Sequence, residues 1–393
     1  MHLTLQQAID AETELRKLIA LYEACDWDGI LAASQQSLKH ADVLGATSAN
    51  AANAAHMYSM VASANTNAAN PHLALQQFQT SKTLLDGIAP TPHKFGAYDN
   101  VALSLMKFNR YADALLLYKQ AFALSSTPMQ TQKSMHCLGV CEECVGNREK
   151  AIKCYAMAFK TATEMPDEHK QVSSLMSAAS CRFYMLEYDA AYAGFERVLQ
   201  MASDPSHAQA VTAVRLGMGA VRWAQWRAVD RPSPQLLGDA LGLMDDALNR
   251  SVELKNMSMR DVRDTLLRLA FANADAENET EALEYLHKML ELCLHDAATQ
   301  CLQCMQAHYK DDTMLTCGGC RIARFCNEDC QRHASSKDGS RNGNHIVRHK
   351  ELCPLLREWH KMQINRMTVD ECVPLQREFL RGPAYGPGAR AHA

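Results

Sequence analysis

Residues 135–160 read MHCLGVCEECVGNREKAIKCYAMAFK and carry the pattern that decides the fold. A first apolar segment around Gly139 is followed by the polar stretch VGNRE and then by a second apolar segment. In that second segment Ala151, Tyr155 and Ala158 are four and three residues apart, which places them on one helix face. A small residue on each helix lets two backbones approach closely. The stretch therefore predicts an antiparallel helix hairpin.

The same pattern recurs along the chain as a small residue, a large apolar residue four later, and a small or apolar residue three further on. Its spacing runs from 37 residues (positions 114 to 151) to 49 residues (positions 191 to 240). One hairpin cannot bury such a face alone, so the recurrence predicts stacked hairpins. The copies are Ala114, Tyr118 and Ala121; Ala191, Phe195 and Val198; Ala240, Met244 and Ala247; Ala282, Leu286 and Met289; a weaker one at Ala74, Phe78 and Ser81; and the weakest near Ile30.

This recurrence resembles the tetratricopeptide repeat, with Leu138 and Gly139 in one first helix and Leu216 and Gly217 in another. The resemblance implies a superhelical array whose first helices line a concave, peptide-binding groove. A rigid spacer is the alternative role for the array. By the register of the repeat, the groove positions include Lys133, His136, Val140, Ser173, Met176, Ser180, Val214 and Met218.

Cysteine use divides the chain in two. Seven of the fifteen cysteines fall between Cys301 and Cys353, in two CxxC pairs followed by CNEDC and HKELC. Two residues between thiolates let both sulfurs reach one Zn²⁺ ion, which prefers four ligands. Eight ligands make two closed sites, so we expect two structural zinc ions without a catalytic role. The predicted ligands are Cys301, Cys304, Cys317, Cys320, Cys326, Cys330, His349 and Cys353.

Two other interpretations of the cysteines stay open. The segment could instead carry redox-active thiols, and His333 or His345 could compete with His349 as a ligand. Cys137, Cys141 and Cys144 share a helix face near His136 and could form a third metal site, although small buried cysteines are typical of tight helix packing.

The two CxxC pairs, the phrase RFCNEDCQ at 324–331 and the closing HKELC resemble the MYND-type zinc finger. The resemblance implies a cross-braced module that binds short peptides. One zinc would be held by Cys301, Cys304, Cys326 and Cys330, and the other by Cys317, Cys320, His349 and Cys353.

The predicted fold is all-α, a superhelical array of hairpins followed by a small two-zinc finger and a C-terminal helix. The expected domains are a tetratricopeptide-like array at 1–297, a MYND-type finger at 301–353, a helical segment at 354–380 and a disordered tail at 381–393.

Composition limits the possible functions. The net charge of −4 gives no general attraction to nucleic acid or anionic membranes, and the sequence shows neither a signal peptide nor a membrane span. Hence we expect a cytoplasmic or nuclear protein. We find no glycine-rich nucleotide loop, nucleophile elbow or open metal site, which argues against an enzyme and a small-molecule substrate.

The sequence thus predicts a zinc-binding adaptor or scaffold for protein–protein interaction, with protein or short peptide partners recognised by the finger and the groove. Two alternatives rest on the MYND resemblance. One is a SET-type methyltransferase, and the other is a SET-less relative of chromatin regulators that acts in transcription. Nucleic-acid binding through arginines of the finger is a further alternative, but acidic residues are interspersed with those arginines.

Overall fold

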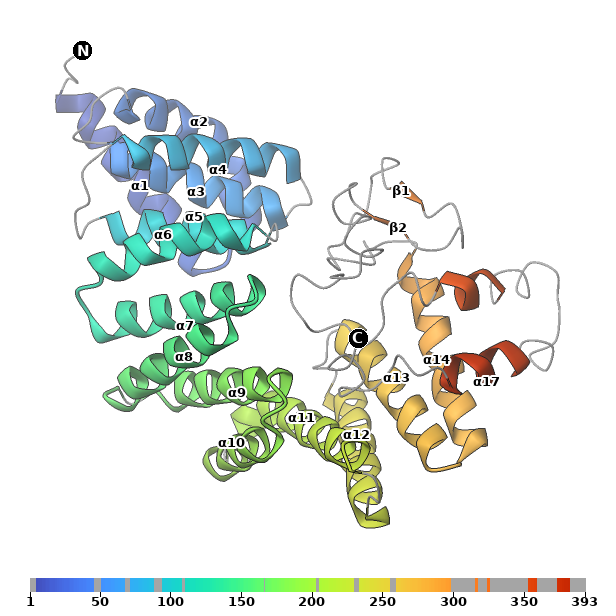
Figure 1. The fold of residues 1–393 in the computed structure, drawn as a ribbon. Helices are drawn as coiled ribbons and strands as arrows, with labels where there is room; N and C mark the ends of the chain where they lie inside the picture. Colours follow the sequence, from blue (N-terminus) through green and yellow to red (C-terminus); the bar gives the residue numbers. More distant parts are fainter. Residues whose placement is uncertain are drawn as a thin grey trace. The chain divides into compact units, whose positions relative to one another are not determined.

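The computed structural model of the protein is helical over nearly all the residues that it describes (Figure 1). The described residues are 5–45, 51–67, 71–87, 94–107, 110–165, 167–202, 205–229, 233–254, 259–297, 315–316, 324–325, 353–358 and 373–381. They form two compact units, residues 1–166 and residues 167–393.

Pairs of antiparallel helices build the first unit. Each odd-numbered helix is the first of a hairpin and the next even-numbered helix is the second (Figure 1). The bounds are α1 (Leu5–Glu23), α2 (Trp27–Gly45), α3 (Ala51–Asn67), α4 (Pro71–Asp86), α5 (Phe95–Lys107), α6 (Tyr111–Leu124), α7 (Pro128–Cys144) and α8 (Arg148–Thr163).

The second unit continues with hairpins of the same kind and adds two short strands and a C-terminal helix. Leu315 pairs with Phe325 in an antiparallel ladder, and residues 353–358 are also helical. The bounds are α9 (Glu168–Tyr184), α10 (Tyr188–Met201), η2 (Pro205–His207), α11 (Ala208–Arg227), α12 (Pro234–Leu254), α13 (Met259–Asp275), α14 (Glu279–Ala297), β1 (Leu315–Thr316), β2 (Arg324–Phe325) and α17 (Val373–Arg381).

The recurring sequence pattern marks the buried face of the second helices. In all six copies from Ala74 to Met289 each of the three residues is at most 3% exposed, and Ile30 in α2 is fully buried. The prediction of stacked helix hairpins is confirmed, because within each unit these faces form the cores that hold neighbouring hairpins together.

Five hairpins share one tight turn. In each, the backbone N–H of the last turn residue donates to the carbonyl of the residue five positions earlier, at 2.7 to 3.0 Å. The carbonyl of that last turn residue accepts the backbone N–H of the first residue of the repeated pattern. The residue before it has a left-handed backbone at Cys25, Gly146, Leu186 and Glu277. The turn fixes where the second helix begins, and its last residues are Asp26, Arg110, Asn147, Glu187 and Asn278.

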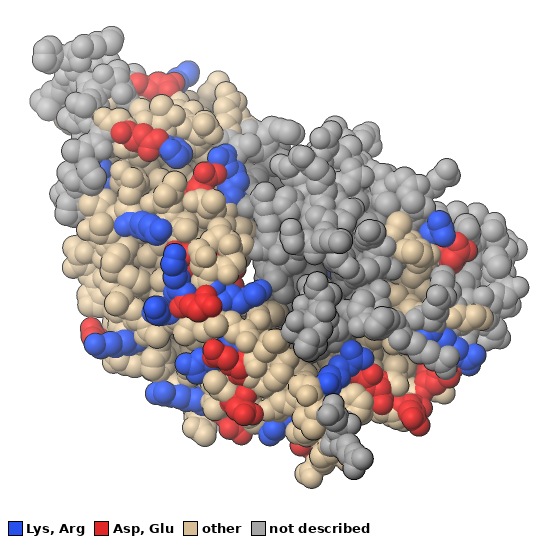
Figure 2. All heavy atoms as spheres, in the orientation of Figure 1, with Lys and Arg blue, Asp and Glu red and all other residues tan. Residues whose placement is uncertain are grey.

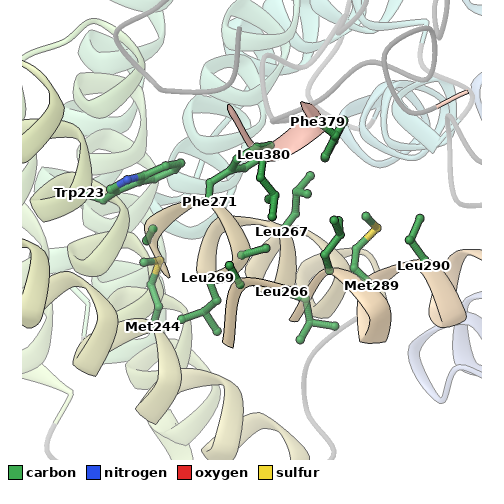
Figure 3. Close-up of a cluster of buried hydrophobic side chains, with 14 of the residues drawn as sticks. Trp223, Met244, Leu266, Leu267, Leu269, Phe271, Met289, Leu290, Phe379 and Leu380 are labelled. Atoms are coloured by element: carbon green, nitrogen blue, oxygen red, sulfur yellow. The ribbon is translucent and has the colours of Figure 1, made fainter. Parts of the chain in front are cut away.

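The largest core of the second unit joins the last two hairpins to the C-terminal helix (Figure 3). Trp223 of α11 stacks on Phe271 of α13, and Phe379 of α17 lies 5.5 Å from the Phe271 ring. Leu355 and Leu356, from the helical residues 353–358, are buried in the same core. Both described pieces of the C-terminal segment therefore pack on the end of the array.

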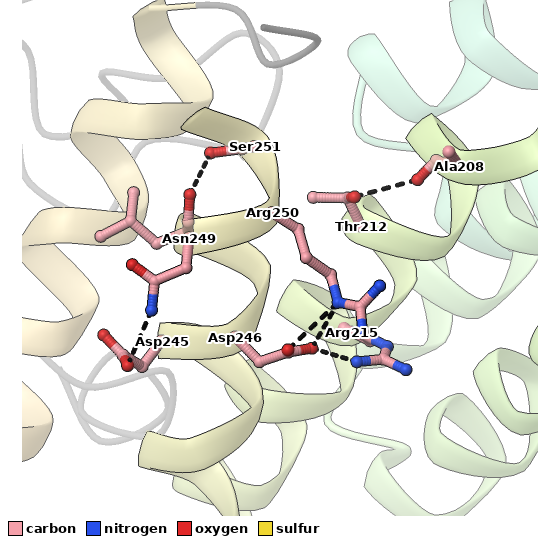
Figure 4. A network of polar contacts seen from close by, with 9 residues as sticks. Ala208, Thr212, Arg215, Asp245, Asp246, Asn249, Arg250 and Ser251 are labelled. Atoms are coloured by element: carbon pink, nitrogen blue, oxygen red, sulfur yellow. Dashed lines mark hydrogen bonds and ion pairs between the residues drawn. The ribbon is translucent and has the colours of Figure 1, made fainter. Parts of the chain in front are cut away.

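Polar contacts tie helices together at the edges of this unit. Asp275 of α13 accepts the indole N–H of Trp223 and two N–H groups of Arg227, at 2.7 to 2.8 Å. Asp246 of α12 accepts from Arg215 of α11 and from Arg250 (Figure 4). Among the described residues on the face in Figure 2, positive and negative side chains are interspersed, which is typical of a solvated surface.

Candidate functional site

Polar residues from the first helices of the first unit meet in what we call the first-helix network. It consists of Tyr22 in α1, Ser63 in α3, Asp99 and Ser104 in α5, and Lys133 in α7. Lys133 Nζ donates to Asp99 Oδ2 at 2.6 Å, and the Ser63 and Ser104 hydroxyls are 3.1 Å apart. Tyr22 hydrogen-bonds with Ser63 and lies within electrostatic reach of Lys133 and Asp99. Four successive hairpins thus contribute to one site.

The two charged members of the network differ in burial. The Asp99 side chain is 4% exposed, whereas the Lys133 side chain is 45% exposed. Burial raises the pKa of Asp99, and the Lys133 ammonium partly offsets this effect. Burial lowers the pKa of Lys133, but Asp99, with smaller contributions from Cys137 and Tyr22, more than compensates, so that pKa is raised. The lysine therefore stays protonated at neutral pH, and part of its side chain is exposed to solvent.

The predicted groove positions on α7 and α9 remain at least partly accessible. Lys133 is exposed, whereas His136 is half-buried with its ring 5.4 Å from the Tyr155 ring, and burial lowers the His136 pKa. The other four positions, Val140, Ser173, Met176 and Ser180, are half-buried. The repeat pattern found Lys133 but missed its partner Asp99, although a lone acidic residue in the apolar stretch FGAYDNVALSL was a visible signal.

On α11 the predicted groove positions are wrong. Val214 is fully buried and Met218 is 5% exposed, and both belong to the core of the second unit. The assumed register took Gly217 as the repeat glycine. A Cβ at Gly217 would lie 2.7 Å from the Phe195 ring of the preceding hairpin, whereas one at Gly219 would lie 2.6 Å from Met244 of its own hairpin.

Gly219 is therefore the counterpart of Gly139, where a Cβ would meet the Tyr155 ring of its own hairpin at 2.6 Å. Moving the register by two residues replaces Val214 and Met218 by Leu216, which is half-buried, and Ala220, which is 3% exposed. Two glycines in one helix serve contacts with two different hairpins, and the repeat spacing alone does not separate them.

The cysteines of α7 are core residues. Burial raises the pKa of the Cys137 thiol to about 11 and raises that of Cys141 as well, so both keep their protons at neutral pH. Cysteine binds a metal ion as the thiolate. Among the described residues, no group of three or more His, Cys, Asp and Glu side chains is placed to hold a metal ion. This finding argues against the third metal site considered from the sequence.

Seven of the eight predicted zinc ligands lie outside the described residues: Cys301, Cys304, Cys317, Cys320, Cys326, Cys330 and His349. Cys353 is half-buried, opens the helical residues 353–358 and packs against the core of the second unit. Metal binding by these eight residues therefore stays a prediction.

Comparisons with known proteins place the fold. A Rap protein complexed with competence and sporulation factor is 10% identical with a TM-score of 0.54, and the match covers 94% of this chain and 99% of that chain. NprR in complex with its cognate peptide NprX is 12% identical with a TM-score of 0.51, covering 93% and 96%. A signal-transduction ATPase with a tetratricopeptide repeat sensor, from Pyrococcus horikoshii, is 13% identical with a TM-score of 0.53, covering 72% and 42%.

The fold is similar to that of tetratricopeptide-like repeat proteins. At 10 to 13% identity, these likenesses concern the fold alone. No family model matches the chain, and no curated protein matches its sequence.

These findings correct the family identification drawn from the cysteine-rich segment. The MYND-type identification is wrong, because no family model matches, the described residues hold no metal-binding group, and the similar solved structures are helical repeat proteins. The identification of the segment as a zinc finger is therefore withdrawn. The two functions that depended on it, a SET-type methyltransferase and a SET-less chromatin regulator, are withdrawn as well. The tetratricopeptide-like part of the identification agrees with the similar structures.

Proposed function

We propose that the protein is an interaction adaptor whose helical array binds a protein or peptide partner. The observation that carries this proposal is the fold, which is similar to a Rap protein complexed with competence and sporulation factor and to NprR in complex with its cognate peptide. Both matches extend over more than nine tenths of this chain. Neither description names a reaction, and we assign no reaction or small-molecule substrate to the array.

The distribution of polar groups on the first helices supports a binding role over a spacer role. A spacer needs only buried faces that join its hairpins. Here the first helices of the first unit also gather a network that includes Asp99 and Lys133, and α9 leaves Ser173, Met176 and Ser180 partly accessible. Polar side chains that remain half-exposed beside packed helices are suited to hydrogen-bonding a partner.

We further propose that the protein works in the cytoplasm or nucleus. Cys25, Cys137, Cys141 and Cys154 are free thiols, which suits a reducing compartment. Among the described helices, none has the length and apolar character needed to span a bilayer.

A selection from random peptides displayed on phage, carried out on the immobilised full-length protein, tests the binding proposal. We expect selected peptides to bind in solution and to slow amide hydrogen exchange in first helices such as α5 and α7. Protection confined to second helices would contradict binding on the first-helix side. Failure to select any peptide that binds in solution would favour the spacer.

A further inference from the structure

Asp99 occupies an unfavourable position for a purely structural residue. Its side chain is 4% exposed, and only Oδ2 has a donor, the Lys133 ammonium. Within the described part of the chain, the buried Oδ1 has no hydrogen-bond partner. Leaving a buried acceptor unsatisfied costs stability, and burying a carboxylate costs more. An asparagine of the same shape would avoid the buried charge, so the carboxylate calls for an explanation beyond packing.

The carboxylate fixes the position of Lys133. A half-exposed lysine normally samples many rotamers, and ordering it upon binding costs conformational entropy. The 2.6 Å contact to Asp99 holds the ammonium in one place, although its side chain is still 45% exposed. The remaining N–H groups of Lys133 are therefore already oriented before any partner arrives.

The charge balance of the pair indicates the kind of group that it would recognise. Asp99 neutralises Lys133, which weakens the attraction for a second carboxylate. A neutral carbonyl oxygen needs only an oriented donor, and an extended peptide presents such carbonyls at regular intervals. The pair is therefore better suited to peptide backbone than to an acidic side chain or a free carboxyl terminus.

We propose that Lys133, held by Asp99, donates a hydrogen bond to a main-chain carbonyl of an extended peptide bound on the first helices of residues 1–166. This inference rests on the proposed function and names its contact. Lys133 touches the peptide, whereas Asp99 is a positioning residue that acts through Lys133.

The test uses the full-length protein and a peptide selected from the random library. Its affinity is measured for the wild type, Lys133→Met, Asp99→Asn and the control Lys82→Met. Lys82 pairs with Asp86 within α4, a second helix, and its side chain is 35% exposed. We expect Lys133→Met and Asp99→Asn each to weaken binding by about tenfold or more, and the control to leave it nearly unchanged.

A stability measurement separates the positioning role from a structural one. We expect the thermal midpoint of Asp99→Asn to equal or exceed that of the wild type, because the buried charge is gone. A lower midpoint together with unchanged affinity would make the pair structural and overturn the inference. A peptide that binds but is insensitive to Lys133→Met would overturn it too, while leaving the proposed function intact. If no peptide is selected, the proposed function and this inference fail together.

Ester substitution identifies the peptide group. Replacing one peptide amide by an ester weakens the carbonyl as an acceptor, so one position should reduce affinity for the wild type but not for Lys133→Met. Raising the salt concentration should change the affinity little, because the pair is neutral overall. A steep loss of affinity with salt would indicate an acidic group in place of a backbone carbonyl and would overturn the assignment.

Discussion

At Gly219 a single missing carbon sets how closely α11 approaches α12. A Cβ at this position would lie 2.6 Å from Met244 Cγ and 3.0 Å from the Ala240 carbonyl oxygen. Gly242, in α12 of the same hairpin, is exposed and has open space around its Cβ position. The two glycines therefore differ in packing while sharing a helical backbone, which makes them a matched pair.

Alanine at these two positions should have opposite effects. Gly219→Ala forces α11 and α12 apart and should lower the free energy of unfolding by about 1 to 3 kcal/mol. Gly242→Ala should raise it by about 0.5 to 1 kcal/mol, because alanine loses less conformational freedom in a helix. Urea denaturation followed by circular dichroism measures both. If both variants changed the free energy of unfolding in the same direction, the close approach of α11 and α12 would not be the reason for glycine at position 219.

A second residue-scale prediction concerns acid. Burial lowers the pKa of His56 in α3 to about 4, from an ordinary value of 6.5. The unfolded chain then takes up the proton at a higher pH than the folded chain, so stability falls as the pH drops from about 6.5 to about 4. At pH 5 the loss from this residue should be about 2 kcal/mol.

Urea midpoints at pH 7.5 and pH 5 check this prediction, with His56→Gln as the comparison because glutamine does not titrate. The variant should lose less stability between the two pH values than the wild type does. The variant should still lose some stability as the pH falls, because burial also lowers the pKa of His136. Equal slopes for variant and wild type would exclude His56 as the source.

Residues that recur with the repeat could be predicted from the sequence, and residues that depend on one distant partner could not. The buried triads such as Ala151, Tyr155 and Ala158 follow a periodic rule, so their spacing was sufficient. The role of Asp99 depends on its contact with Lys133, which is 34 residues away on another helix. No local pattern encodes that contact.

At the scale of whole elements, the C-terminal helix α17 shows how the array ends. Nine residues make a helix too short to be stable alone in water, so packing must hold it. Phe379 and Leu380 are buried against α13 and α14, and Gln376 lies 2.8 Å from His287. The helix thereby covers apolar surface that the final hairpin of a stack would otherwise expose.

Truncating this contact should destabilise the second unit. Phe379→Ala removes a 9% exposed ring from the core and should cost about 3 kcal/mol, with faster hydrogen exchange in α13 and α14. Arg377→Ala serves as the control, because its ion pair with Glu279 is exposed and should contribute less than about 1 kcal/mol. Comparable losses in both variants would mean that α17 is held by its polar edge.

The sequence predicted the buried face of a helix correctly where that helix packs closely against one hairpin. It failed on α11, which packs closely against two. Each second helix shows a single buried face, and the shared turn gives it a fixed start. In α11 both Gly217 and Gly219 make close approaches, to the preceding hairpin and to its own hairpin. A choice between them needs the packing of neighbouring hairpins, so the sequence took the wrong glycine as the reference for α11.

On the scale of the whole molecule, the array could be recognised from periodicity, but the family of the cysteine-rich segment could not be read from motif phrases. Short CxxC phrases reflect ligand chemistry that unrelated chains share, and no family model matches here. The question of metal is separate from the family name, because it rests on the spacing of Cys301, Cys304 and their companions.

Metal analysis of protein purified without chelator tests the eight predicted ligands directly. If the spacing of the eight ligands is sufficient, each chain should carry two zinc ions. Cys317→Ser should reduce the content, whereas His345→Ala should leave it unchanged if His349 is the ligand. A content near zero with all thiols free to react would contradict the prediction and favour redox chemistry in this segment.

The core shown in Figure 3 has a thermodynamic consequence for that segment. Leu290 and Leu292 near the end of α14 pack in the same cluster as Leu355 and Leu356, so the intervening chain leaves one hydrophobic cluster and returns to it. Because the folded cluster already closes this loop, a ligand bound within it would not have to supply the free energy of loop closure. Ligand binding in that segment would therefore be linked to folding of the last hairpin, and each would strengthen the other.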